Sequence, residues 1–142
     1  MRSLDTNILL RLLLNDIPEQ AQAVEVLLSE AGPNSFAVAD AVFFECAWVL
    51  GGPLYHFDRQ AIGDLLLHLT TIKQINCNRT LITRAVPLFI EHRAISFIDA
   101  CLAVYAELNN AAPLLTYDKK LVMALPILAA NQFRGGAENA DG

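Results

Sequence analysis

The sequence predicts an α/β fold in which an open parallel sheet of four to five strands carries helices on both faces. Three observations lead to this prediction. Short apolar runs of strand length alternate along the chain with longer segments whose apolar residues recur at helical spacing. Glycine, proline, asparagine and aspartate separate the two kinds of segment, as is typical of turns and helix starts. The 142 residues show no internal repeat and suit one domain, so the strands should share one sheet.

The first half of the chain alternates strands and helices, with two successive helices between the first two strands. Pro18 is placed to begin the second of these helices. Asp40 is expected to cap the third, and Gly51 follows its last turn. The expected elements are a strand at 2–4, helices at 6–14 and 18–31, a strand at 35–39 and a helix at 40–50.

The second half continues the same alternation. Asp58 is expected to cap a helix, and Ser96 to begin another that ends at Asn109 and Asn110. The expected elements are a helix at 59–70, a brief edge strand at 73–77, helices at 79–93 and 96–108, a strand at 113–117, a short helix from 119 and a last strand within 123–130. We expect one domain over residues 1–131 and a flexible, glycine-rich tail over 132–142.

Composition narrows the functional class. Apolar residues make up 54% of the chain, which is enough for a core and, we expect, for part of a subunit interface. No apolar run is long enough to cross a bilayer, so we expect a soluble, cytoplasmic protein with no membrane partner. The three cysteines and three histidines lack metal-ligand spacing, which makes a zinc site unlikely. The net charge of −5 argues against binding nucleic acid by overall charge, unless divalent cations offset the acids.

Asp5 lies where the first strand turns into the first helix. Thr6 and Asn7 beside it supply further oxygen donors. Ligands of a parallel α/β sheet bind at the carboxyl ends of the strands, so Asp5 is a candidate site residue. The alternative is that Asp5 or Thr6 only caps the helix.

Glu45 is the single charged residue between 41 and 50, a helix that is otherwise apolar on every face. Such a helix is expected to be buried, where an ionised carboxylate is costly unless a cation or hydrogen bonds compensate it. The alternatives are a salt bridge to Arg11 or Arg93, or a side chain that leans out to solvent.

Two further aspartates also lie at the start of a helix or at the end of a strand. Asp99 is in the first turn of the helix that Ser96 begins, and Asp118 ends the strand at 113–117. Both can be explained as helix caps, Asp99 through a capping box with Ser96.

In a right-handed parallel arrangement, Asp5, Glu45, Asp99 and Asp118 fall on one rim of the sheet. Four carboxylates on one rim stay ionised together only with a divalent cation among them. Oxygen ligands without histidine or cysteine select Mg²⁺ or Mn²⁺, and such sites suit phosphoryl chemistry. Neither a glycine-rich phosphate loop nor a Gly-x-Ser-x-Gly motif is present, so nucleoside-triphosphate and serine-hydrolase chemistry have little support.

Four stretches, taken in order, resemble the successive motifs of the PIN-domain ribonucleases, and in particular of the VapC-like toxins of bacterial type II toxin-antitoxin modules. They are Leu4-Asp-Thr-Asn-Ile-Leu-Leu10, Glu45 before Trp48-Val-Leu50, Phe97-Ile-Asp-Ala-Cys-Leu102 and Leu115-Thr-Tyr-Asp-Lys-Lys120. The resemblance covers residues 2–125 and implies a three-layer sandwich.

By this resemblance, the four acids hold one or two Mg²⁺ or Mn²⁺ ions, supported by Thr6, Asn7 or Thr116. It also implies hydrolysis of single-stranded or looped RNA by metal-activated water, a homodimer, and neutralisation by a cognate antitoxin protein. The chain departs from the family in residues 51–57, which lack the lysines and arginines often found there. Phosphate contacts would then fall to Arg11, Arg93, Lys119 and Lys120.

Two other functions remain open. One is a catalytically weak PIN-like domain that binds metal, RNA or a partner without turnover. The other is a different phosphoryl-transfer enzyme, such as a DNA flap nuclease or a phosphatase, although a flap nuclease would be expected to carry more basic surface.

Overall fold

A computed structural model of the chain describes residues 1–131, and the tail expected at 132–142 lies outside these residues. The fold is α/β with parallel strands, as the sequence predicts. The chain divides into two compact units, Met1–Thr83 and Arg84–Gly142, and the division falls inside one helix. No helix among the described residues has the length and apolar character needed to cross a membrane.

The first unit contains a three-stranded parallel sheet in the order β1-β2-β3. Its elements are β1 (Arg2–Ser3), α1 (Thr6–Leu14), α2 (Pro18–Ser29), β2 (Phe36–Ala37), α3 (Asp40–Leu50), α4 (Arg59–Thr71), β3 (Ile75–Asn76) and the start of α5 (Arg79–Glu91). Arg2 pairs with Phe36, and Phe36 with Ile75, so the three strands are in register and β1 and β2 both end towards a following helix. This register places the start of α1 and the start of α3 at the same edge of the sheet.

Apolar side chains from the sheet and from helices α1, α2, α3 and α4 form the core of the first unit. Helix α1 packs against α2 and α3, and α3 packs against α4. Fully buried members of this core include Leu9, Phe43, Leu50, Leu66 and Ile75. The core therefore fixes α1 and α3 relative to each other, and these helices carry Asp5 and Glu45 at or after their starts.

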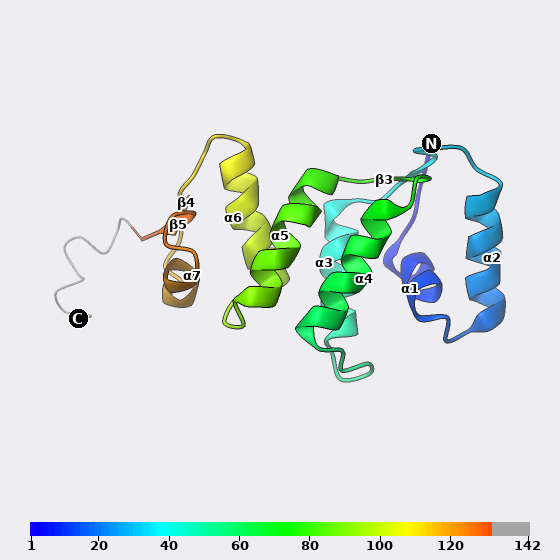
Figure 1. Ribbon diagram of the computed structural model, residues 1–142, viewed down its shortest axis with the longest axis horizontal. Coiled ribbons are helices and arrows are strands. Elements are labelled where there is room, and N and C mark those ends of the chain that lie inside the picture. The colour runs from blue at the N-terminus through cyan, green and yellow to red at the C-terminus, as the bar shows by residue number, and fades with distance from the viewer. Residues whose placement is uncertain (132–142) are drawn as a thin grey trace. The chain divides into compact units, whose positions relative to one another are not determined.

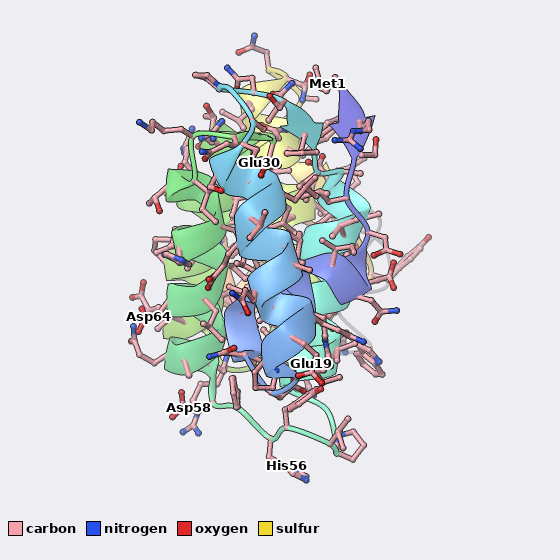
Figure 2. The ribbon with its side chains drawn as sticks, turned by 90° about the vertical axis from the view of Figure 1, so that its right-hand side faces the viewer. Met1, Glu19, Glu30, His56, Asp58 and Asp64 are labelled. Atoms are coloured by element: carbon pink, nitrogen blue, oxygen red, sulfur yellow. The ribbon has the colours of Figure 1, made fainter. Side chains whose placement is uncertain are left out.

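Two connections of the first unit, the turn between α1 and α2 and the loop before α4, lie at the same end (Figure 2). Figure 2 shows Glu19, at the start of α2, at the same end as His56 and Asp58 of the loop before α4, while Glu30 and Met1 lie at the opposite end. The loop at 51–58 therefore lies near the turn that joins α1 to α2.

The second unit contains the remainder of α5, α6 (Phe97–Leu108), β4 (Leu114–Leu115), α7 (Lys119–Ala124) and β5 (Ala129–Ala130). Strands β4 and β5 pair in parallel (Figure 1). The rings of Phe89 and Phe97 meet edge to face with centroids 5.6 Å apart, and Arg84 forms an ion pair with Glu107. These two contacts join α5 to α6.

Most expected helices and strands are present, with different ends. The five strands within residues 1–131 are each two residues long and pair as a three-stranded and a two-stranded sheet, so the expected single sheet of four to five strands is not confirmed. Asp58 and Ser96 cap their helices as expected. The prediction for Asp40 was wrong: Ala39 is the capping position of α3, no side chain bonds there, and Asp40 is the first helical residue.

The expectation that the helix at 40–50 is buried on every face was also wrong. Trp48 is 81% exposed and Glu45 is exposed, while Phe43 and Cys46 are buried. Helix α6, which is equally apolar, exposes Leu102 and Tyr105. Each helix packs one side against its own unit, and apolar composition alone does not supply a neighbour for the other side.

Candidate functional site

Asp5 is the capping residue of α1, directly after the end of β1. Its Oδ1 accepts a hydrogen bond from the backbone N–H of Ile8 at 3.1 Å, so this side chain caps α1. The side chain is exposed, and its second oxygen has no hydrogen-bond partner in the described part of the chain. Thr6 is buried and Asn7 is exposed, so Asn7 is the more accessible of the two supporting donors.

Glu45 lies in the second turn of α3 with an exposed side chain. It takes part in no hydrogen bond or ion pair within the described residues of its unit. The proposed salt bridge to Arg11 is absent, because Arg11 pairs with Asp16 instead at 3.2 Å. The alternative that the side chain leans out to solvent is therefore the one that the structure supports, and the carboxylate is available to a ligand.

Asp99 closes a capping box at the start of α6. Its backbone N–H donates to Oγ of Ser96 at 3.0 Å, and its Oδ2 accepts from the backbone N–H of Ser96 at 3.2 Å. Here too the side chain takes part in capping its helix. The side chain is half-buried, and Oδ1 has no hydrogen-bond partner among residues 1–131.

Asp118 is the capping residue of α7, three residues after the end of β4. Its Oδ1 accepts from the backbone N–H groups of Lys120 and Leu121, at 2.9 and 3.2 Å. Thr116 holds the backbone of Asp118 by accepting its N–H at 3.0 Å, a supporting contact that the sequence did not specify. The carboxylate is exposed beside Lys119 and Lys120, which are both exposed as well.

The three aspartates therefore share one local arrangement. In each, a backbone N–H at a helix start fixes one carboxylate oxygen while the other oxygen is left for a ligand. A cap and a ligand are thus compatible roles for the same side chain, because a carboxylate has two oxygens and about four lone-pair sites. The helix N-terminus also favours the ionised form that a metal ligand needs.

The donor set fits a hard cation. All four candidate ligands are carboxylates, and hydroxyl and amide oxygens lie beside them, which suits Mg²⁺ or Mn²⁺. Asp5 and Glu45 belong to the first unit, and Asp99 and Asp118 to the second. Within the described residues of either unit taken alone, no three histidine, cysteine or acidic side chains lie close enough to hold a metal ion. The convergence of all four acids on one rim stays a prediction.

The candidate phosphate contacts differ in availability. Arg11 is half-buried, with its guanidinium against Asp16 and 3.4 Å from the hydroxyl of Tyr55. Arg93, Lys119 and Lys120 are exposed. Sequence reasoning gave Arg11 a role in RNA contact and missed its pairing, although the acid five residues away was a signal that could have indicated it.

Trp48 is the exposed residue that sequence reasoning left without a role. It lies three residues after Glu45, a spacing that places both side chains on one face of α3. The spacing alone indicated that they share a face, but not that this face is exposed.

Comparison with protein-family models matches the PIN domain over residues 3–124. No match is found among curated proteins or among solved structures. The matched range includes all four candidate acids, and PIN domains are generally nucleases that typically use divalent metals. The match spans most of the chain and agrees with the parallel α/β fold, so the chain belongs to the PIN domain family.

Proposed function

We propose that this protein is an Mg²⁺- or Mn²⁺-dependent endoribonuclease that hydrolyses phosphodiester bonds of single-stranded or looped RNA. The observation that carries this proposal is the shared arrangement of Asp5, Asp99 and Asp118, each with one anchored and one unbonded oxygen. Glu45 adds a fourth carboxylate, which is exposed and has no ion pair in its unit, within a PIN-family chain. The resemblance of the motifs to those of VapC-like toxins supports RNA as the substrate.

Asp5, Glu45, Asp99 and Asp118 would hold one or two divalent ions. Such ions make water more nucleophilic and stabilise the attacking and leaving oxygens of an in-line displacement. The protein's own part is orientation: the backbone amides at the starts of α1, α6 and α7 restrict the aspartate rotamers, so little side-chain freedom is lost when a ligand binds. Asn7 and Thr116 lie next to two of these caps and are suited to support the ligands or the attacking water.

Lys119 and Lys120 are the best-placed groups to bind a substrate phosphate. They follow Asp118 directly and are exposed. Arg93 is exposed too, whereas Arg11 would have to leave Asp16 before it could bind a phosphate. We therefore assign the larger share of phosphate binding to the two lysines.

A site of all four acids requires the carboxyl ends of β1 and β4 to meet at one edge. A single parallel sheet of four to five strands, in a three-layer sandwich over residues 1–131, would bring them there. Taken separately, each of the two smaller sheets is parallel and has one strand that is followed by an aspartate cap.

We also propose that the protein acts as the cytoplasmic toxin of a toxin-antitoxin pair, as a homodimer that a cognate antitoxin protein neutralises. The support is the motif resemblance together with the exposed apolar stripe of α6. Its members are Ile98, Leu102, Tyr105 and Leu108, each at least 36% exposed. An apolar stripe of this kind is typical of a surface that packs against another chain.

The test is a cleavage assay on the purified protein, freed of any antitoxin, with structured RNA, single-stranded DNA and a generic phosphomonoester. Each substrate is offered with Mg²⁺, Mn²⁺ or chelator. The Asp5→Asn variant keeps an oxygen that can cap α1 and removes the charge, so it separates folding from metal binding. We expect cleavage of RNA that requires both metal and Asp5.

A second function is favoured by one observation: residues 51–57, after the helix that carries Glu45, contain no lysine or arginine. A PIN-like domain without this basic segment could bind metal, RNA or a partner and not cut. Metal-dependent RNA binding without products would support this function over the nuclease. Turnover of DNA or of the phosphomonoester alone would identify a different phosphoryl-transfer enzyme.

A further inference from the structure

The strongest feature that the proposed function leaves unused is the ring of Trp48. It is 81% exposed, although tryptophan is among the side chains that are most buried on average. The side chain stands on α3, whose opposite side is anchored in the core by Phe43 and Leu50. A rigid helix therefore presents a large flat ring to solvent.

Trp48 and Glu45 share one face of α3, because residues three apart on a helix have Cβ atoms about 5–6 Å apart. Ala41, one turn before Glu45, is also exposed and is small. The face thus combines a flat aromatic ring, an exposed carboxylate without an ion pair in its unit, and an open approach to both.

We propose that Trp48 is a stacking platform for an unpaired base of single-stranded RNA, next to the phosphodiester bond that is cut. This deepens the function proposed above and rests on it. Bases stack on aromatic rings regardless of sequence, and single-stranded RNA is bound largely in this way. Trp48 would be a substrate-binding residue, and its distance from Glu45 would help to decide which bond of the RNA reaches the acids.

Few cations of the first unit are available to bind phosphates near Trp48. Residues 51–57 contain no lysine or arginine, and Arg11 is already paired with Asp16. Stacking does not depend on positive charge, so it supplies affinity where salt-dependent contacts are few.

The same face is poorly suited to a second copy of the chain. A protein interface over Trp48 would also cover Glu45 and remove an unpaired carboxylate from water, which costs several kcal/mol. A base can cover the ring and leave the carboxylate to a cation. The chemistry of the face therefore distinguishes the two occupants, and we assign the face to RNA.

Trp48 is the only tryptophan of the chain, so its fluorescence reports on this site without interference. The experiment uses the full-length protein with the Asp5→Asn change, which prevents cleavage, in a buffer that contains Mg²⁺. The ligand is a short single-stranded RNA that carries a fluorescent end label. Binding is followed in parallel by tryptophan quenching and by the anisotropy of the label. An abasic oligonucleotide of equal length keeps the phosphates and lacks the bases.

We expect quenching by the RNA and none by the abasic chain. Adding Trp48→Ala should weaken RNA binding about 5- to 150-fold, the equivalent of about 1–3 kcal/mol for one stacked base. Trp48→Phe should restore most of the affinity, since its ring also stacks. Leu54→Ala removes another exposed apolar side chain, 76% exposed in the following loop, and should leave the affinity unchanged.

Three results would overturn the stacking site: equal quenching by the abasic chain, an unchanged affinity of Trp48→Ala, or quenching that appears on concentrating the protein alone. The last would show a second copy over Trp48. If the wild-type protein cleaves RNA while Trp48→Ala binds it normally, only the stacking site is wrong. If no nucleic acid is cleaved but base-dependent quenching persists, the nuclease proposal fails and the stacking site stands.

Discussion

Arg11 and Asp16 form a half-buried ion pair, with Nη1 of the arginine 3.2 Å from Oδ1 of the aspartate. The hydroxyl of Tyr55 joins both: it accepts from Nη2 of Arg11 at 3.4 Å and donates to Oδ2 of Asp16 at 3.3 Å. The hydroxyl of Tyr55 therefore connects the loop after α3 to α1 and to the turn that follows it. These two helices carry Asp5 and Glu45, so the contact supports the part of the site that belongs to the first unit.

Removing the counterion of Arg11 should destabilise the protein. The arginine side chain is only 17% exposed and its Nε is buried without a partner, so Asp16→Ala leaves a poorly solvated charge. We expect a loss of about 1–2 kcal/mol in the free energy of unfolding, between the values for exposed and buried pairs. Urea denaturation measures it. Glu25→Gln, on the exposed side of α2, is the matched control, and an equal effect of the two changes would contradict this role of Asp16.

Glu45→Gln should fold normally. The side chain is exposed and unpaired within its unit, so its charge contributes little to folding, and the change in stability should stay within about 0.5 kcal/mol. In chelator, the variant would even gain stability if the four acids repel one another. Thermal melts with and without Mn²⁺ measure both effects. The wild-type protein should be stabilised by Mn²⁺ and the variant less so; equal stabilisation would remove Glu45 from the metal ligands.

Two substitutions of Asp118 separate its structural role from its proposed catalytic role. Asp118→Ala removes the acceptor for the N–H groups of Lys120 and Leu121 and should cost about 1 kcal/mol. Asp118→Asn keeps an acceptor oxygen and should cost less. Both should abolish metal-dependent cleavage of RNA. Cleavage by a well-folded Asp118→Asn variant would leave Asp118 as a cap alone.

Arg79 should contribute more to stability than any exposed cation. Its Nε donates to the carbonyl of Thr70 at 2.7 Å, and its Nη2 donates to those of Ile72 and Ile75 at 3.0 and 2.5 Å. Three carbonyl groups between α4 and β3 would lose their charged donor in Arg79→Ala, which should cost at least about 2 kcal/mol. Lys73→Ala, an exposed cation in the same connection, should have almost no effect in the same denaturation experiment.

Cys46 should make stability fall at alkaline pH. Burial and, to a smaller extent, the nearby charge of Glu45 together raise the pKa of its thiol from the ordinary 9.0 to about 12. Above pH 9 the unfolded chain loses this proton and the folded chain keeps it, so the free energy of unfolding should fall by up to about 1.4 kcal/mol per pH unit until about pH 12.

The contribution of Cys46 is measured as the difference between the wild-type protein and Cys46→Ala, by urea denaturation at pH 8 and at pH 10.5. Lysine and tyrosine titrations are common to both proteins and cancel in the comparison. The wild-type protein should lose more stability over this range than the variant. Parallel losses would show that the thiol is not protected by burial.

Local chemistry was enough to predict the caps at Asp5, Asp99 and Asp118. Asp5 and Asp118 stand just before a helix and accept from N–H groups two or three positions later, and Asp99 accepts from the N–H of Ser96, three positions earlier. Each partner is therefore within a few residues of the carboxylate. The same reasoning failed at Asp40, because a residue one position earlier, Ala39, already has the extended conformation of the capping site. Element ends depend on such small differences, whereas the alternation of strands and helices does not.

The sequence by itself determined the α/β class, the order of the helices and strands, and the presence of four acids in stretches that resemble PIN-family motifs, because periodicity and capping depend on neighbouring residues. Only the tertiary structure decided that Arg11 pairs with Asp16 and Tyr55, and that Glu45 and Trp48 face solvent. These contacts and exposures depend on which side of each helix packs against another element. A helix that is apolar all round leaves that choice open, and it is settled by contacts between residues that lie far apart in the chain.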